Sequence, residues 1–199
     1  VAIAAPAVAA NAQQAEAGKQ GVTWINVDGL ADIDLLRALG KKYGLHALSL
    51  EDAVNVNQLA KTDVYDHNLY IVMRMPCDVA PFETEQLSIF LLNGLVLTFQ
   101  EVAGDCLDSV RQRIARSKGR IRTRGADYLA YSIIDAVIDG YFPLLEKYDA
   151  ILRSIGDEIE EDLSHEIPRK LHEIRADLLQ VRKVAQQQQD ALLMLMHEE

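Results

Sequence analysis

The pattern of apolar and polar positions changes twice along this chain and predicts three parts. Residues 1–20 carry little pattern and are expected to form a weakly ordered lead-in or an edge strand. Residues 21–125 hold short apolar runs bounded by turn residues, which predict a sheet covered by helices. Residues 126–199 repeat apolar side chains at helical spacing, which predicts a long helical hairpin.

Five strand-like runs alternate with helical patterns in the middle part. Strands are predicted at 22–27, 62–66, 68–75, 85–92 and 95–100, and helices at 32–43, 46–55 and 106–117. Asn93-Gly94 lies between the last two strands and is a strong hairpin signal, because both central residues of a type I′ turn need positive φ. The predicted fold class is α+β, an α/β/α arrangement in which helices flank a mixed, largely antiparallel sheet.

The last part is predicted to contain two long helices. The first, an acidic helix over 126–163, contains Gly140 and Pro143, so a kink or break is expected near 139–143. The second helix, over 167–199, carries apolar residues spaced alternately by four and three positions. The positions of this seam are Ile167, Leu171, Ile174, Leu178, Val181, Ala185, Gln188, Leu192 and Leu195, with Gln188 as the one interruption. A seam this long needs neighbouring helices, from the same chain or from other copies, and indicates an assembling protein with a stalk.

The composition narrows the function classes. The 199 residues are 49% hydrophobic and 25% charged, which is typical of a soluble globular protein, and the formal net charge is −10. An acidic surface disfavours non-specific binding of nucleic acid and favours cations. No apolar run is long enough to cross a bilayer, so the chain as given is expected to be soluble. Cys77 and Cys106 require no disulfide, and a reduced setting is expected.

Basic residues gather between Arg111 and Arg124. Nucleic-acid binding by such a block usually involves stacking aromatic side chains, and none is interleaved here. A solvated face, or pairing with acids of the same or an adjacent copy, is the favoured interpretation. We expect no nucleic-acid partner.

Clustered carboxylates are the candidate cation ligands. Glu51 and Asp52 are adjacent, and Asp135 and Asp139 lie four positions apart on one helix face. An acidic block near the end of the first long helix adds Asp157, Glu158, Glu160 and Glu161. Carboxylate oxygens suit hard cations such as Mg²⁺ or Ca²⁺, although each group also fits a solvated helix face. No phosphate-binding glycine loop and no set of nucleophile, base and orienting residue is recognisable, so an enzyme is not expected.

Several segments together resemble one known family. They include TWINVDGL (23–30), LHALSLEDAVN (45–55), YIVMRM (70–75), EQLSIFL (85–91), LVLTFQE (95–101) and GADYLAYSIIDAVIDGYFPLLE (125–146). From about residue 22 to its end, the chain resembles the cytoplasmic domain of CorA-type magnesium channels. The resemblance implies a homopentamer at the cytoplasmic face of the inner membrane, with a stalk helix, here truncated, leading to membrane helices and a pore that lie outside this sequence.

The same resemblance implies a regulatory role for bound Mg²⁺. In the family, cations between neighbouring cytoplasmic domains favour the closed channel. The matching ligands here are Asp52 within the LEDA element, with Glu51 and Asp135 supporting a secondary site; Asp139 and the acidic block are weaker candidates. The acids offer only oxygen, which favours Mg²⁺ or Co²⁺. A domain of a zinc-transporting relative, and a soluble coiled-coil scaffold with no metal role, remain the alternatives.

Overall fold

The computed structural model describes residues 2–5, 8–15, 21–77, 81–116, 120–161 and 166–197. Within these residues one sheet of seven strands has the order β1-β2-β3-β7-β6-β5-β4. The strands are β1 (Ala2–Ala5), β2 (Val8–Ala15), β3 (Val22–Asp28), β4 (Lys61–Tyr65), β5 (Asn68–Pro76), β6 (Thr84–Leu92) and β7 (Leu95–Gln100). The segment for which a lead-in or an edge strand was predicted contains β1 and β2, and β2 pairs with β3.

The sheet is mixed because β3 runs parallel to β7, while the other described neighbours are antiparallel. Strands β4 to β7 are the last four predicted strands and pair in sequence order as an antiparallel meander. Gly94, in the turn between β6 and β7, has φ +73°. The predicted fold class, a mixed and largely antiparallel sheet flanked by helices, is therefore confirmed.

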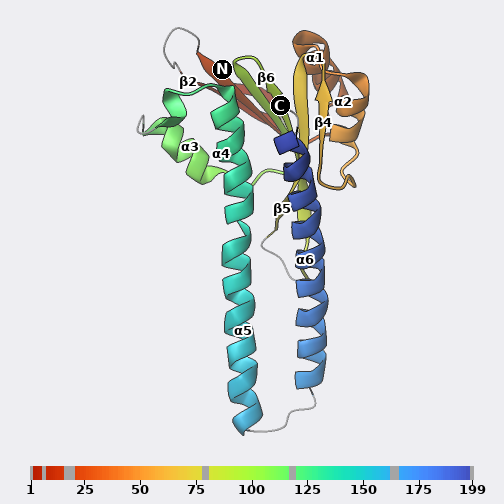
Figure 1. Ribbon diagram of the computed structural model, residues 1–199, viewed down its shortest axis with the longest axis vertical. Coiled ribbons are helices and arrows are strands. Elements are labelled where there is room, and N and C mark those ends of the chain that lie inside the picture. The colour runs from red at the N-terminus through yellow and green to blue at the C-terminus, as the bar shows by residue number, and fades with distance from the viewer. Residues whose placement is uncertain are drawn as a thin grey trace.

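Helices cover both faces of the sheet and continue into a hairpin (Figure 1). They are α1 (Ile33–Tyr43), α2 (Ala47–Val54), α3 (Asp108–Ala115), the short 3₁₀ helix η1 (Arg120–Arg122), α4 (Ala126–Asp139), α5 (Tyr141–Glu161) and α6 (Ile167–His197). Helices α1 and α2 pack on one face, against a cluster that contains Tyr70 and Phe90. Helices α3 and α4 pack on the opposite face.

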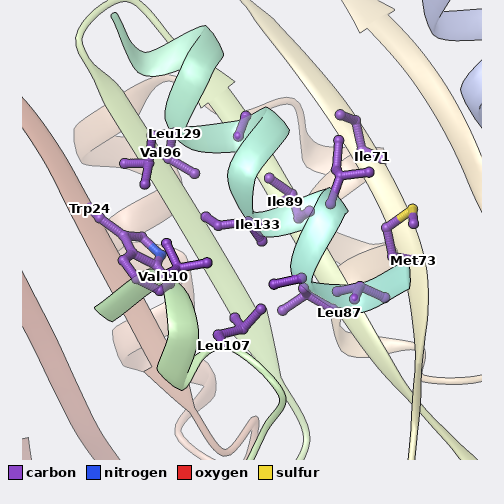
Figure 2. Packing of buried hydrophobic residues seen from close by; sticks show 14 of the residues in the cluster. Trp24, Ile71, Met73, Leu87, Ile89, Val96, Leu107, Val110, Leu129 and Ile133 are labelled. Atoms are coloured by element: carbon purple, nitrogen blue, oxygen red, sulfur yellow. The ribbon is translucent and has the colours of Figure 1, made fainter. Parts of the chain in front are cut away.

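The second cluster shows how α4 is held. Figure 2 shows Ile133 and Leu129 of α4 over the strands, close to Ile89 and Val96. Ile133 is fully buried, and its removal from water supplies about 2 kcal/mol or more of stabilisation. Among the described residues one helical stretch, Ala126–Ile159, is apolar and long enough to span a membrane by composition and length, with 44% of its most apolar window buried in the protein. In the α4 part of this stretch, the apolar side chains are buried against the sheet.

The hairpin explains most of the predicted seam. The break expected near 139–143 occurs at Gly140, between α4 and α5. Helix α6 then returns alongside α5 toward the sheet (Figure 1). Ile167, Ile174 and Val181 are buried in a cluster with Tyr148 and Ile155 of α5. The other row of the seam is more open, since Leu171 is exposed and Leu178 is half-buried. The neighbour that the seam requires is therefore supplied in part by the same chain.

Candidate metal centre at Asp52

Asp52 lies near the C-terminal end of α2, on the sheet face that α1 and α2 cover. His46 caps the start of this helix, because its Nδ1 accepts a hydrogen bond from the Leu48 N–H at 3.3 Å. Ser49 and Ala53 are buried toward the sheet. Helical geometry leaves Glu51 exposed to solvent and places Asp52 half-buried at the rim of the helix.

A buried glutamine fixes the backbone around Asp52. Gln86 of β6 is 1% exposed, and its Nε2 donates to the Asp52 carbonyl oxygen at 2.9 Å. Its Oε1 accepts from the Gln58 N–H at 3.1 Å, which holds the loop after α2 against the helix. The Gln58 side chain then donates from Nε2 to Asp52 Oδ1 at 3.1 Å. Gln86 thus fixes the backbone at Asp52, and Gln58 orients the carboxylate.

Lys61, the first residue of β4, is the charged neighbour of Asp52. Its Nζ donates to Asp52 Oδ2 at 2.6 Å and lies 2.7 Å from Asp63 Oδ2. Burial lowers the pKa of the Lys61 ammonium, but the hydrogen bonds and charges of the two aspartates outweigh burial and raise that pKa overall. The ammonium also lies 5.7 Å from the ring centroid of Tyr70. Lys61 is thus a fixed positive charge between two acids.

The donor chemistry of this rim suits Mg²⁺, but the number of ligands is small. Asp52 and Asp63 offer carboxylate oxygens, the ligands that hard cations take. No group of three or more His, Cys, Asp or Glu side chains that could hold a metal ion occurs in the part of the chain that the structure describes. An ion at Asp52 would therefore keep water ligands or share ligands from another chain, which fits Mg²⁺ because it retains part of its hydration shell.

The other predicted ligands lie elsewhere. Asp135 and Asp139 are exposed on α4, which covers the opposite face of the sheet from α2. Asp157 is exposed near the end of α5 farthest from the sheet, and Glu158 there accepts from Lys170 Nζ at 3.0 Å. The side chains of Glu160 and Glu161 lie outside the described residues. Among the described side chains, Asp52 therefore has only its chain neighbour Glu51 close by from the predicted ligands, while Asp135 and Asp139 form a separate pair on α4.

Sequence reasoning did not identify Lys61, Gln58 or Gln86 at this site. The signal for Gln86 was present, since a glutamine inside an otherwise apolar strand needs a buried partner. Lys61 gave no comparable signal, because its contact with Asp52 depends on how β4 lies beside α2.

Glu85 is a second acid near this region and is more deeply buried than Asp52. It lies on β6 next to Gln86, and its Oε1 accepts from the Val102 N–H at 2.9 Å. Burial raises the pKa of this carboxyl, and the hydrogen bonds from the Val102 and Glu101 N–H groups only partly oppose that shift. The folded protein therefore binds the Glu85 proton more tightly than the unfolded chain does.

Glu85→Gln is expected to increase the free energy of unfolding at pH 7 and to leave it unchanged below about pH 4. Below the ordinary pKa of 4.5 both states hold the proton, and as the pH rises through the higher folded pKa the native carboxylate is charged in a buried place. Urea denaturation at several pH values measures this. Glu146→Gln, at an exposed site on α5, is the control and should change stability little at any pH. A loss of stability at pH 7 in the Glu85 variant would contradict the argument.

Comparison with known proteins gives consistent matches. A family model described as "CorA-like Mg2+ transporter protein" matches residues 19–199. The cobalt/magnesium transport protein CorA of Thermotoga maritima is 39% identical over 164 residues, which cover 81% of this chain and 47% of that protein. The chain spans about half the length of this protein and of the putative metal ion transporter YfjQ of Bacillus subtilis, 47% and 53% respectively.

Solved structures match the fold over most of the chain. The complete structure of the CorA magnesium transporter from Methanocaldococcus jannaschii has a TM-score of 0.78 and 21% identity, and the match covers 99% of this chain and 64% of that chain. The structure of the soluble domain of CorA from the same organism has a TM-score of 0.76 and 21% identity, covering 89% and 71%. At this identity the likeness concerns the fold alone.

Proposed function

This chain belongs to the CorA-like Mg²⁺ transporter family, and from that premise we propose that it is the cytoplasmic regulatory domain of a divalent-cation channel. In this proposal Mg²⁺, or Co²⁺ in its place, binds at Asp52 between neighbouring copies of the chain and favours the closed channel. The observation that carries the proposal is the orientation of Asp52. Gln86 binds its backbone carbonyl oxygen, and Gln58 binds its half-buried carboxylate. Among the residues that the structure describes, too few acids lie nearby to surround an ion alone. The role is regulation of transport and not catalysis.

Ion binding between copies links Mg²⁺ concentration to assembly. An ion that binds only the associated state stabilises it by RT ln(1 + [L]/Kd). When the ion leaves, carboxylates from two copies face each other and repel, which loosens the contact. We propose a homopentamer, attached to the membrane through segments beyond this sequence. Glu51 and Asp135 support a secondary site in this proposal, and Asp139 and the acids of 157–161 are weaker candidates. Asp135 and Asp139 lie on the opposite face of the sheet from Asp52.

Mg²⁺ is expected to raise the melting temperature of this chain by about 3–5 °C at a concentration about ten times its Kd. Asp52→Asn should remove most of that increase, because the amide keeps the shape of the side chain but not its charge. Asp34→Asn is the control, since Asp34 lies on α1, on the same side of the sheet, and its side chain is 97% exposed. Differential scanning fluorimetry with MgCl₂ against a KCl solution of equal ionic strength measures the effect.

The same titration on a chain extended at its C-terminus includes ligands that a neighbouring copy would supply. An increase that persists in Asp52→Asn would remove Asp52 from the site. If Mg²⁺ raises the melting temperature of neither the given chain nor the extended chain, the scaffold function is favoured. An apolar groove of about 410 Å³ between α5 and α6 also supports that function; Leu145, Leu192 and Met196 are among the residues that line it. An apolar groove of this kind is a surface on which a further helix can pack, and such packing needs no metal.

A further inference from the structure

We propose that Lys61 is a built-in competitor of the metal ion, which sets the Mg²⁺ concentration at which the Asp52 site fills. This inference rests on the proposed function, because it assigns the regulation of the same site. It concerns a residue of this chain and follows from its contacts. Lys61 would act on the ion through Asp52, without itself being a ligand.

Both oxygens of the Asp52 carboxylate already have a hydrogen-bond partner. Oδ2 accepts from the Lys61 ammonium at 2.6 Å, and Oδ1 accepts from Gln58 Nε2 at 3.1 Å. The pair is partly shielded from water, with 31% of the Lys61 side chain and 26% of the Asp52 side chain exposed. A cation that binds Asp52 through Oδ2 competes with the ammonium for that oxygen, so the energy of the Lys61 contact opposes ion binding.

Asp63 makes this exchange feasible. It lies two positions after Lys61 on β4, so both side chains point to the same face of the strand, and its Oδ2 is already 2.7 Å from the ammonium. When an ion takes Asp52, Lys61 keeps one carboxylate partner and is not left as an unpaired charge. The Tyr70 ring, 5.7 Å from Lys61 Nζ, also favours a cation at this place. In the exchange, the Lys61 ammonium therefore gives up its contact with Asp52 and keeps its contact with Asp63.

The energy involved decides how large the effect is. A partly exposed ion pair contributes on the order of 1 kcal/mol, and a tenfold change in an equilibrium constant corresponds to about 1.4 kcal/mol. Removal of the ammonium also leaves Asp52 and Asp63 to repel each other, which favours an incoming divalent ion. The site should consequently fill at a Mg²⁺ concentration about three- to tenfold lower without Lys61.

The test is a Mg²⁺ titration of the melting temperature in Lys61→Met, which keeps an unbranched side chain of nearly the same length and removes its charge. The midpoint is expected to fall about three- to tenfold relative to the unchanged chain, while Lys61→Arg should restore most of the competition. Arg169→Met is the control: it removes a positive charge and its pair with Glu173, an acid of α6 that is not among the candidate ligands. Its midpoint should not move.

The outcomes separate this inference from the proposed function. A Mg²⁺ response that disappears in Asp52→Asn but has the same midpoint in Lys61→Met would overturn the role of Lys61 and leave the function standing. If the melting temperature responds to Mg²⁺ in Lys61→Met but not in the unchanged chain, competition between Lys61 and the ion is supported. No response in any variant would overturn both proposals.

A second measurement keeps the inference testable if Lys61→Met does not fold. In the unchanged chain labelled with ¹⁵N-lysine, Mg²⁺ is expected to shift the Nζ resonance of Lys61, because its hydrogen bond to Asp52 is lost. The shift should be absent in Asp52→Asn. A Lys61 resonance that stays in place while the melting temperature rises would contradict the displacement.

Discussion

Arg111→Met is expected to lower the free energy of unfolding by about 3–5 kcal/mol, the largest single effect that this fold suggests away from its apolar cores. The Arg111 guanidinium binds both carboxylate oxygens of Asp105, at 2.6 and 2.5 Å. Only 2% of the Asp105 side chain is exposed. Without the arginine, a buried carboxylate remains with no counter-charge, which costs far more than the loss of a surface ion pair.

The surroundings of this pair increase the expected loss. Asp28 is a further acid close to this pair. Burial raises the pKa of the Asp28 carboxyl, the negative charge of Asp105 raises it further, and the positive charge of Arg111 opposes the shift. In the variant both carboxylates repel each other without the cation between them. The loss should therefore be larger at pH 7 than at pH 4, where protonation relieves the repulsion. Urea denaturation at both pH values measures the difference.

Arg153→Met is the matched control for this prediction. Arg153 binds Asp149 at 2.7 Å on α5, but both side chains are mostly exposed. An exposed pair contributes less than about 1 kcal/mol, so this variant should unfold almost like the unchanged chain. Equal losses in the two variants would mean that burial of Asp105 is not the cause. The double variant Asp105→Asn with Arg111→Met should recover part of the stability, since neither partner is then a buried charge.

The position of Arg111 shows where sequence reasoning reaches its limit. In the sequence it is one member of a basic block that ends at Arg124, and a solvated face or pairing within the chain suits the whole block equally. In the structure Arg111 is partly buried between Asp105 and the Trp24 ring, 5.6 Å from the ring centroid, whereas Arg124 is exposed. The difference follows from the packing of α3 against the sheet, which the local pattern of charges does not contain.

The elements themselves could be predicted because their signals are local. Strand β7 is an apolar run after a turn that needs positive φ, and Gly94 supplies it. The break between α4 and α5 falls at Gly140, three positions before Pro143. The parallel pairing of β3 with β7 could not be predicted in this way, since it joins Trp24 to Val96 across most of the sheet domain.

The candidate site depends on the same long-range order. A resemblance to a known family pointed to Asp52, and the local pattern also marked Asp135 as an acid on a helix. Only the strand order shows that α2 and α4 lie on opposite faces of the sheet, so these two acids of one chain cannot share an ion. The same order places Lys61 beside Asp52, which turns a simple carboxylate into one that is already paired.

Gln188 is the case in which the sequence pattern and the structure lead to opposite expectations. It is the one polar residue in the seam of α6, so the pattern alone predicts that leucine would improve the packing. In the structure Gln188 is 1% exposed, and its Oε1 accepts from the Arg74 N–H at 3.2 Å. β4 pairs with β5 only as far as Val72, so Arg74 lies past its end, and the Tyr141 hydroxyl donates to the Arg74 carbonyl oxygen at 2.6 Å.

Two helical side chains thus take the place of a strand partner, and Gln188→Leu is expected to lower the free energy of unfolding by about 1–3 kcal/mol. The leucine fills a similar volume but leaves the Arg74 N–H buried without an acceptor, and the cost of an unsatisfied buried donor exceeds the gain from one more apolar contact. Amide hydrogen exchange should localise the effect, with faster exchange at Arg74 than at Val72, which keeps its pairing with β4.

Gln186→Leu is the control, because Gln186 is exposed on the same helix and its replacement should change stability by no more than about 0.5 kcal/mol. Were Gln188→Leu to match or exceed the stability of the unchanged chain, apolar packing of the seam would decide the docking of α6, and the contact with Arg74 would be incidental. Faster amide exchange at Arg74 alone would mean that the hydrogen bond from the Arg74 N–H to Gln188 holds α6 to the edge of the sheet. The hairpin and the strands beside Asp52 would then move as one unit, since the Thr62 hydroxyl, next to Lys61, also donates to the Ala191 carbonyl oxygen of α6 at 2.9 Å.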